Sequence, residues 1–302
     1  MQKQKHFCLR MRARIIQAIR AFFIKNGYLE VETPLRIPAP IPEAHIDGFE
    51  SEEWYLQSSP EICMKRMAAM GYEKIFQICK CFRKEERGDR HLTEMTLLEW
   101  YTKGFTYKEL MAQTAELIRY VGLETGGTKQ LIYGDKTIFL DRPWEYITVA
   151  RAFETHADIS MERAMAKGIF DEVMAFDIEP ELGKNRPAFL FDYPAAMGAL
   201  ARLKPNDSGI AERFELYIAG MELANGFSEL TDPQEQQLRF SNELALKKNA
   251  GKKLTPMPCN FLKDLEHLPD TAGIALGVDR LVMLFANVDT IDQVVAFTPE
   301  TL

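Results

Sequence analysis

The stretch that decides the fold runs from Cys81 to Tyr101 and reads CFRKEERGDRHLTEMTLLEWY. The residues just before it, IFQIC, and its own end, TLLEWY, are rich in apolar and β-prone side chains. Between these segments, the part from Arg83 to His91 holds seven formally charged residues and no apolar one. The pattern predicts two paired strands, 75–82 and 95–101, joined by a charged loop.

Glu99 is the unexpected residue of the second strand. Because side chains alternate along a strand, one face carries Met95, Leu97, Glu99 and Tyr101. An unpaired buried carboxylate is costly, so Glu99 requires a cation or a hydrogen-bond donor. The sequence leaves two interpretations open, a structural salt bridge and a site for a cationic ligand. The charged loop equally fits a solvated tip.

Outward from this hairpin, apolar periodicity and turn residues predict the other elements. Helices are expected over 9–25, over 59–71 with Ser59 as cap, and over 107–122. An alternating segment follows the first helix at 28–34, and a hairpin is expected across Gly134-Asp135. Strands are expected from Ala188 onward. We find no repeat or long linker, so we expect one α+β domain over 1–302, an antiparallel sheet flanked by helices.

Composition excludes several classes of protein. The net charge is −7, whereas a general nucleic-acid binder usually carries a basic face. No apolar run reaches the roughly 18 residues of a membrane span, and the N-terminus does not resemble a secretory signal. Five cysteines lack metal-ligand spacing, so we expect free thiols and a cytoplasmic protein.

Two carboxylates meet in the segment RFELYIAGMELANGF. A hairpin turning at Ala219-Gly220 sets Tyr217 opposite Glu222 and places Glu215 diagonal to Glu222, about 7–8 Å away by strand geometry. Two acids so placed repel each other unless a cation joins them, and Mg²⁺ bridging to a phosphate would do so. The alternative is two acids on an exposed sheet face.

A strand GIALGV leads into an apolar helix that begins with Asp279 and Arg280. Asp279 suits a helix cap, whereas Arg280 in the first turn opposes the helix dipole unless an anion lies beside it. A phosphate, Asp279 or Glu222 could be that anion. Gly273 and Gly277 would let a ligand approach the backbone closely.

These features together suggest an anionic nucleotide held by arginines and Mg²⁺, next to carboxylates that could hold a cationic substrate. Glu61, in the first turn of the 59–71 helix, suits the helix dipole without any further role. The residues alone name neither the nucleotide nor the substrate.

The ordered motifs resemble a known family. FRKEE…H…E.T.LEWY is similar to motif 2 of the class II aminoacyl-tRNA synthetases, GIALGVDRLVMLF to motif 3, and the first helix with YLEVETP to motif 1. SPEICMKR and ELANGFSELTD resemble the lysyl-tRNA synthetase catalytic domain. Motif 1 begins near residue 10 with no anticodon-binding OB-fold domain before it. That arrangement resembles the EpmA (PoxA/GenX) family, the elongation factor P–(R)-β-lysine ligases.

The resemblance implies a class II synthetase catalytic fold, an ATP- and Mg²⁺-dependent ligase, and roles for particular residues. Arg83 and Arg280 would act on the ATP phosphates as the catalytic residues, and the nucleotide site would further include Glu85, His91, Glu222, Leu223 and Gly277. Glu215 and Glu222 would ligate Mg²⁺. The amino acid would be surrounded by Ser59, Pro60, Glu61, Glu99, Tyr101, Asn225, Glu229 and Ala275.

The implied reaction activates lysine or (R)-β-lysine as an adenylate and transfers it to a lysine side chain of translation elongation factor P. Ala275, where lysyl-tRNA synthetases usually carry glycine, favours the β-amino acid. Leu92 and Met95 depart from the usual HNPEFT pattern, which bears on ATP binding. Motif 1 implies a homodimer. The alternatives are a minimal lysyl-tRNA synthetase, although a tRNA partner is disfavoured, and a non-catalytic lysine-binding regulator.

Overall fold

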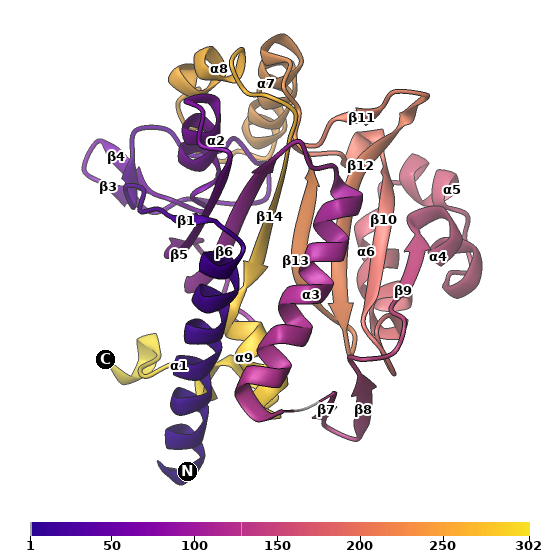
Figure 1. Cartoon of the computed structure of the whole chain (residues 1–302). Helices are drawn as coiled ribbons and strands as arrows, with labels where there is room; N and C mark the ends of the chain where they lie inside the picture. The colour runs from indigo at the N-terminus through magenta and orange to yellow at the C-terminus, as the bar shows by residue number, and fades with distance from the viewer. Residues whose placement is uncertain (1, 128) are drawn as a thin grey trace.

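A mixed β-sheet forms the centre of the molecule (Figure 1). The structure, a computed structural model, describes residues 2–127 and 129–302. In this part of the chain, the large sheet has nine strands in the order β1-β5-β6-β14-β13-β12-β10-β9, with β11 paired to β12. The strands are β1 (Leu29–Glu30), β5 (Lys74–Phe82), β6 (Glu94–Lys103), β9 (Glu145–Thr148), β10 (Ala188–Pro194), β11 (Leu203–Lys204), β12 (Asp207–Ile218), β13 (Met221–Ser228) and β14 (Thr271–Gly277).

The inner strands pair antiparallel, as the sequence predicts. The hairpin expected over 75–82 and 95–101 is confirmed as β5 and β6, with Gln77 opposite Glu99. The edge strands differ from the prediction, because β1 and β9 join their neighbours in parallel. β1 also has only two residues, although the next residue, Val31, still donates its N–H to the Phe76 carbonyl at 2.9 Å.

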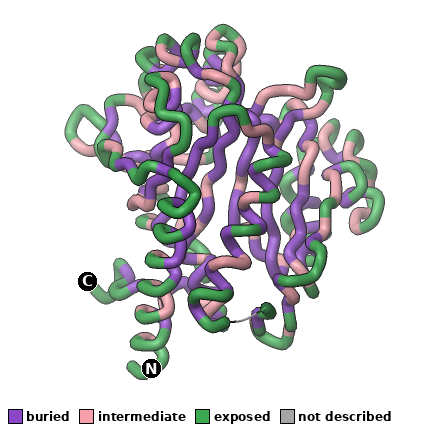
Figure 2. The backbone as a smooth tube through the Cα atoms, in the orientation of Figure 1, coloured by how far each residue is buried: buried purple, intermediate pink, exposed green. Residues whose placement is uncertain are grey.

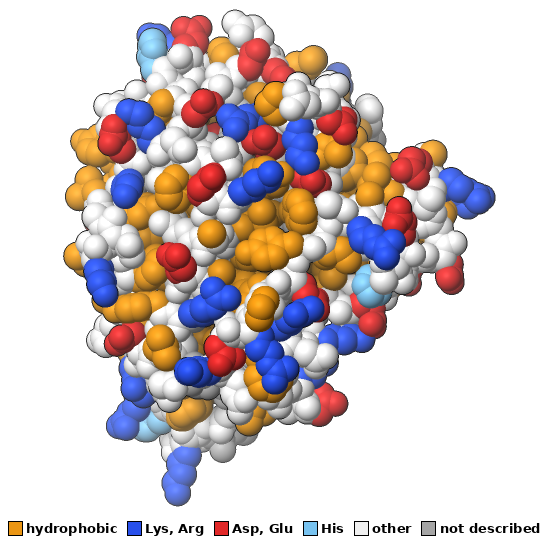
Figure 3. All heavy atoms as spheres, turned by 45° about the vertical axis from the view of Figure 1, so that its right-hand side comes forward, with side chains coloured by type: hydrophobic (Ala, Val, Ile, Leu, Met, Phe, Trp, Pro, Cys, Tyr) orange, Lys and Arg blue, Asp and Glu red, His pale blue; other side chains and the backbone are white. Residues whose placement is uncertain are grey.

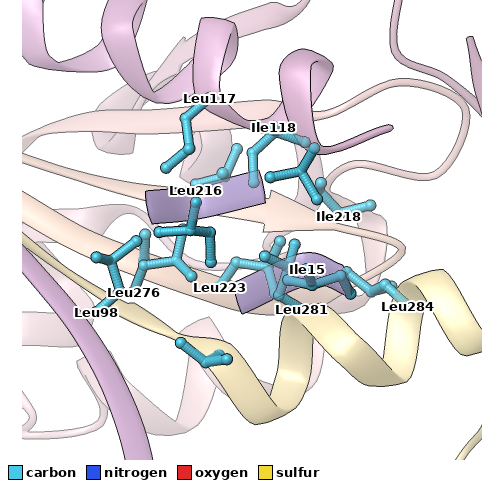
Figure 4. Close-up of a cluster of buried hydrophobic side chains, with 14 of the residues drawn as sticks. Ile15, Leu98, Leu117, Ile118, Leu216, Ile218, Leu223, Leu276, Leu281 and Leu284 are labelled. Atoms are coloured by element: carbon cyan, nitrogen blue, oxygen red, sulfur yellow. The ribbon is translucent and has the colours of Figure 1, made fainter. Parts of the chain in front are cut away.

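Helices α1 (Gln2–Lys25) and α3 (Tyr107–Gly126) lie side by side on one face of the sheet, and α9 (Val278–Ala286) lies at their lower end (Figure 1). The first helix therefore starts earlier than the predicted residue 9. Figure 4 shows Ile15 of α1, Leu117 of α3 and Leu281 of α9 packed among side chains of the strands. These strand residues include Leu98, Leu216, Leu223 and Leu276.

The remaining helices lie at two other places (Figure 1). α2 (Glu61–Ala69), α7 (Pro233–Asn249) and α8 (Cys259–Leu265) gather at one end of the sheet, whereas α4 (Val149–His156), α5 (Met161–Ala166) and α6 (Phe170–Val173) flank β9 and β10. A small sheet joins β2 (Arg36–Ile37), β3 (Glu50–Ser51) and β4 (Trp54–Leu56). The expected hairpin across Gly134-Asp135 is confirmed as β7 (Gln130–Tyr133) and β8 (Lys136–Phe139).

Alternation along β6 divides its side chains between the two faces of the sheet. Leu98 and Trp100 pack under α1 in the main core, so the odd-numbered residues face the other way. Figure 2 shows that buried residues follow the central strands and exposed ones the outer turns and helix faces. The face that carries Glu99 is therefore buried as well, although α1 and α3 do not cover it.

The expectations about membrane helices, cysteines and surface charge can be compared with the structure. No described helix is long and apolar enough to cross a membrane. The five cysteines are free thiols, as expected. On the face drawn in Figure 3, basic and acidic side chains are intermingled.

Asp279 does not cap α9, contrary to the sequence-based expectation. Gly277 occupies the N-cap position, and the Asp279 side chain lies within the first turn. Its carboxylate accepts a bond of 2.5 Å from the Arg12 guanidinium of α1 and one of 2.7 Å from the backbone N–H of Thr96 in β6. Asp279 thus connects α1, β6 and α9 in the protein interior. Its role is this buried ion pair and hydrogen bond, not helix capping.

Replacing Asp279 with asparagine should destabilise the protein by about 3 kcal/mol, because Arg12 would lose its charged partner in a largely buried position. Urea unfolding followed by circular dichroism measures the change. Asp141→Asn, on the surface, is the matched control and should stay within about 0.5 kcal/mol of wild type. Equal stability of the two variants would contradict a stabilising role for this ion pair.

Candidate active site

A cavity of about 390 Å³ opens on the sheet face opposite α1 and α3. Its floor comes from Met95, Leu97, Glu99 and Tyr101 of β6, which confirms that these four side chains share a face. Neighbouring strands add Asn225 of β13 and Ala275 of β14, which stand opposite each other in the sheet. The walls come from the start of α2, the charged loop after β5, and the start of α9.

Glu99 lies at the centre of this floor and is only 1% exposed. One carboxylate oxygen accepts the Ser59 hydroxyl at 2.6 Å, and the other accepts the Tyr101 hydroxyl at 3.0 Å. Among the residues that the structure describes, no cation lies within 4 Å of it. Burial, reinforced by the nearby charge of Glu61, raises the pKa of Glu99 to about 8. The interpretation of Glu99 as half of a structural salt bridge is therefore wrong.

A second buried group lies beside Glu99. The Lys65 ammonium is 2.6 Å from Glu61 and also contacts Glu229, and the Lys65 side chain is fully buried. Burial works against its charge, but Glu229 and Glu61 outweigh burial and raise the pKa of Lys65. Burial also raises the pKa of Glu229 to about 8, although Lys65 opposes this. Glu61 and Glu229 thus share one internal cation, and Glu99 beside them has none.

Lys65 is absent from the site residues predicted from the sequence, although the sequence holds a signal for it. Glu61 and Lys65 are four residues apart on α2, which is the spacing of a helical ion pair. The expectation of Ser59 as the helix cap is wrong by one residue, although the Ser59 hydroxyl does accept the Glu61 N–H at 3.0 Å. Pro60 occupies the N-cap position and does not line the cavity.

Gly273 provides the room for this group of acids. A Cβ at this position would lie 2.3 Å from the Glu229 carboxylate and 2.3 Å from the Tyr101 ring. The sequence predicted that a ligand would approach the backbone at Gly273, but the groups that do so are the side chains of Glu229 and Tyr101. At Gly277 a Cβ would meet its nearest neighbours at 3.8 Å, an ordinary contact.

Gly273→Ala should displace Glu229 or Tyr101 and so reduce the affinity for a cationic amino acid by about 10-fold or more, since an overpacked site shifts its neighbours. Isothermal calorimetry with lysine measures the effect. Gly48→Ala is the matched control, because its Cβ would touch one ring atom at 3.6 Å. Unchanged lysine affinity in Gly273→Ala would show that the packing around Glu229 does not position the site.

The other end of the cavity is basic. Arg83, Arg90, His91 and Arg280 line it. The Arg280 guanidinium donates to the Glu222 carbonyl at 2.7 Å and contacts the His91 ring nitrogen. Burial and then the neighbouring arginines lower the pKa of His91 to about 4, so its neutral ring accepts from Arg280.

These arginines keep free charge for a ligand. The carboxylate nearest to Arg83 is Glu86 at 3.8 Å, and Arg280 is 3.5 Å from Glu222. Asp279 is not the ion-pair partner of Arg280, because its carboxylate is paired with Arg12. Of the three anions that the sequence allowed for Arg280, Glu222 is present at 3.5 Å, and the cavity beside the guanidinium also has room for a phosphate, whose charge matches.

The hairpin of Glu215 and Glu222 is only partly as predicted. It turns at Ala219-Gly220, both with positive φ, and Tyr217 stands opposite Glu222. A β-bulge then shifts the register, so that Glu215 faces Asn225. The bulge arises because Glu222, Leu223 and Ala224 of β13 span only two residues of β12.

Glu215 is buried behind the cavity lining and is already bonded. Its carboxylate accepts from Arg213 at 2.7 Å and from the Tyr193 and Tyr217 hydroxyls at 2.5 and 2.6 Å. Burial raises the pKa of Glu215, Arg213 opposes this, and Glu222 adds to it. Among the described residues, no group of three His, Cys, Asp or Glu side chains is arranged to hold a metal. A divalent ion at Glu222 would thus need further oxygens from a bound phosphate.

Most of the other predicted site residues also reach the cavity. Its lining includes Ser59, Glu61, Arg83, Leu223 and Gly277. Glu85 lies exposed on the charged loop with positive φ, and Glu86 lines the cavity in its place. Glu229, which was expected to surround the amino acid, does not line the cavity, and neither does its partner Lys65. The nucleotide and substrate roles of these residues remain predictions.

Comparison with known proteins agrees with the geometry. The model of the tRNA synthetases class II (D, K and N) matches residues 1–301. Curated relatives named elongation factor P–(R)-β-lysine ligase are 38% identical in Pseudoalteromonas translucida and in Vibrio campbellii, covering 96% of this chain and 94% of each relative. A relative of that name in an Enterobacter strain is 37% identical over 95% of this chain and 93% of its own length.

The family model over residues 1–301, together with the mixed sheet flanked by helices, shows that the chain has the class II synthetase catalytic fold. The chain belongs to the class II (D, K and N) tRNA synthetase family and, within it, to the family of the elongation factor P–(R)-β-lysine ligases.

Proposed function

We propose that this protein uses ATP to activate lysine or (R)-β-lysine as an aminoacyl adenylate and transfers it to a lysine side chain of translation elongation factor P. The observation that carries the proposal is the two-ended cavity. Its acidic end is lined by Glu61 and the buried Glu99, with the ion pair of Lys65 and Glu229 next to Glu61, and its basic end has three arginines. An amino acid with two ammonium groups has the charge that complements the acidic end, and a nucleoside triphosphate has the charge that complements the basic end.

The residues at the acidic end would bind and orient the amino acid. Glu99, fixed by Ser59 and Tyr101, would accept a substrate ammonium, and the ion pair would become favourable because Glu99 has no cation of its own. Ala275 narrows the cavity next to Glu99, since the two residues stand opposite each other in β14 and β6. One methyl group there can favour one lysine isomer over another by a modest factor.

The residues at the basic end would place the phosphates. Arg83 would contact the α-phosphate and Arg280 the γ-phosphate, while neutral His91 holds the Arg280 guanidinium. The substrate carboxylate would then attack the α-phosphorus in line, and pyrophosphate would leave. Positioning and charge neutralisation supply most of the acceleration in such phosphoryl chemistry.

Mg²⁺ would be held by Glu222, with Glu215 behind it, and would neutralise phosphate charge when bound. The partial exposure of Glu222 and the repulsion between the two acids fit this role.

Glu222→Gln should raise the Mg²⁺ concentration for half-maximal pyrophosphate exchange by about 10-fold and leave lysine binding intact. Glu94→Gln, an exposed acid of β6, is the control. An unchanged Mg²⁺ requirement would contradict the assignment.

The relatives' names support elongation factor P as acceptor, whereas the fold alone would also fit tRNA. Purified protein with Mg-ATP and labelled lysine or (R)-β-lysine should label elongation factor P and not bulk tRNA, with the preferred isomer incorporated at least about 10-fold faster. Scintillation counting of the separated acceptors checks this. Label on tRNA would identify a minimal lysyl-tRNA synthetase, and the absence of pyrophosphate exchange would favour a non-catalytic regulator.

We also propose a homodimer. Large apolar side chains are exposed along α1 and the adjoining sheet edge, where the two-residue strand β1 leaves the sheet open. They are Phe7, Ile24, Leu29, Leu35 and Tyr72. Sedimentation at micromolar concentration should give twice the chain mass of 34.6 kDa. A single-chain mass would contradict the dimer.

We further propose a cytoplasmic location and a single catalytic domain over 1–302. Five free thiols fit a reducing compartment, and the large sheet joins strands from both halves of the chain, including β1 and β14.

A further inference from the structure

The segment 38–48 forms a wall of the cavity that none of the sequence motifs explains. It follows β2 and precedes β3, and it brings Glu43 and Ile46 to the cavity lining. The segment has no helix or regular strand of its own, so its position depends on contacts with its neighbours.

α7 fixes this segment through two side chains one helical turn apart. The Glu243 carboxylate accepts the backbone N–H of Ala44 at 2.8 Å, and the Lys247 ammonium donates to the Ile46 carbonyl at 2.6 Å. Lys247 is 2% exposed, and its ion pair with Asp47 measures 3.1 Å. The residues on both sides of Glu43 are thus held in place.

The segment is also tied to the charged loop. The Asp47 carbonyl accepts the backbone N–H of Lys84 at 2.8 Å, next to Arg83. Glu43 therefore stands over the part of the cavity between the acidic and basic ends, close enough to Arg83 and Glu61 for their charges to act on it.

Glu43 has no partner of its own for its charge. Among the residues that the structure describes, no donor forms a hydrogen bond or ion pair with its carboxylate. Burial raises the pKa of Glu43 to about 7; Arg83 opposes this, and the charges of Glu61 and Glu243 add to it. A half-buried carboxylate held firmly over a cavity without a partner is suited to receive a cation from a ligand.

We propose that Glu43 binds the substrate ammonium group nearest to the substrate carboxylate, together with Glu61. The inference rests on the proposed function, because it assumes a cationic amino acid in this cavity. The substrate has two ammonium groups, and Glu99, buried in the cavity floor without a cation of its own, receives the distal one. The carboxylate must lie toward Arg83, which places the proximal ammonium beneath Glu43.

Ligands that lack one ammonium group test this assignment. Binding of lysine, norleucine and 6-aminohexanoate to wild type and to Glu43→Gln is measured by calorimetry. Glu43→Gln should lower the affinity for lysine and for norleucine, which carry the proximal ammonium, by about 10- to 100-fold. The affinity for 6-aminohexanoate, which lacks that ammonium, should stay within about twofold of wild type.

Glu53→Gln is the matched control, since Glu53 is exposed on the turn before β4. Glu43→Asp, which keeps the charge on the same segment, should restore part of the lysine affinity, a recovery that a purely structural role would not require. The inference is overturned if Glu43→Gln binds lysine with wild-type affinity, or if its affinity for all three ligands falls by the same factor. If wild type binds no lysine or (R)-β-lysine at all, the proposed function fails and this inference fails with it.

Discussion

The structure depends on a surplus of buried carboxylates at one end of a cavity. Glu61 and Glu229 share the ammonium of Lys65, whereas Glu99 has no cation within 4 Å among the residues that the structure describes. Burying a charge without a partner costs several kcal/mol, so part of the surplus is held as protonated acid until a cation arrives. The protein is in this sense incomplete without its ligand. A dicationic amino acid supplies what is missing.

The sheet makes this surplus possible because it separates two incompatible environments. On β6, Leu98 and Trp100 face the apolar core under α1, while Glu99 and Tyr101 face the cavity. A glycine at 273 leaves space for Glu229 against the strand. At the basic end, Arg12 occupies Asp279 and so leaves the charge of Arg280 for an anion.

Much of the site could be predicted because it follows from local rules. The period of a strand placed Glu99 and Tyr101 on one face, and the hairpin turn placed Tyr217 opposite Glu222. The ordered motifs identified the family. Lys65 could have been found from its helical spacing to Glu61.

What could not be predicted depends on contacts between distant parts of the chain. Asp279 fits a helix cap locally, but its partner Arg12 lies 267 residues away and decides its role. The bulge that moves Glu215 opposite Asn225 leaves no clear signal in RFELYIAGMELANGF. Glu43 reaches the cavity only because Glu243 and Lys247 of a distant helix hold its segment.

The most direct test of the central claim is proton release when lysine binds. Glu99 has a pKa of about 8 and no cation beside it, so it is largely protonated at pH 7 in the free protein. A bound ammonium favours the ionised form, so binding should release about one proton at pH 7, and affinity should increase as pH rises from 6 toward 8. Calorimetry in two buffers of different ionisation enthalpy measures this release. A binding enthalpy independent of the buffer, with affinity constant over that pH range, would contradict the account.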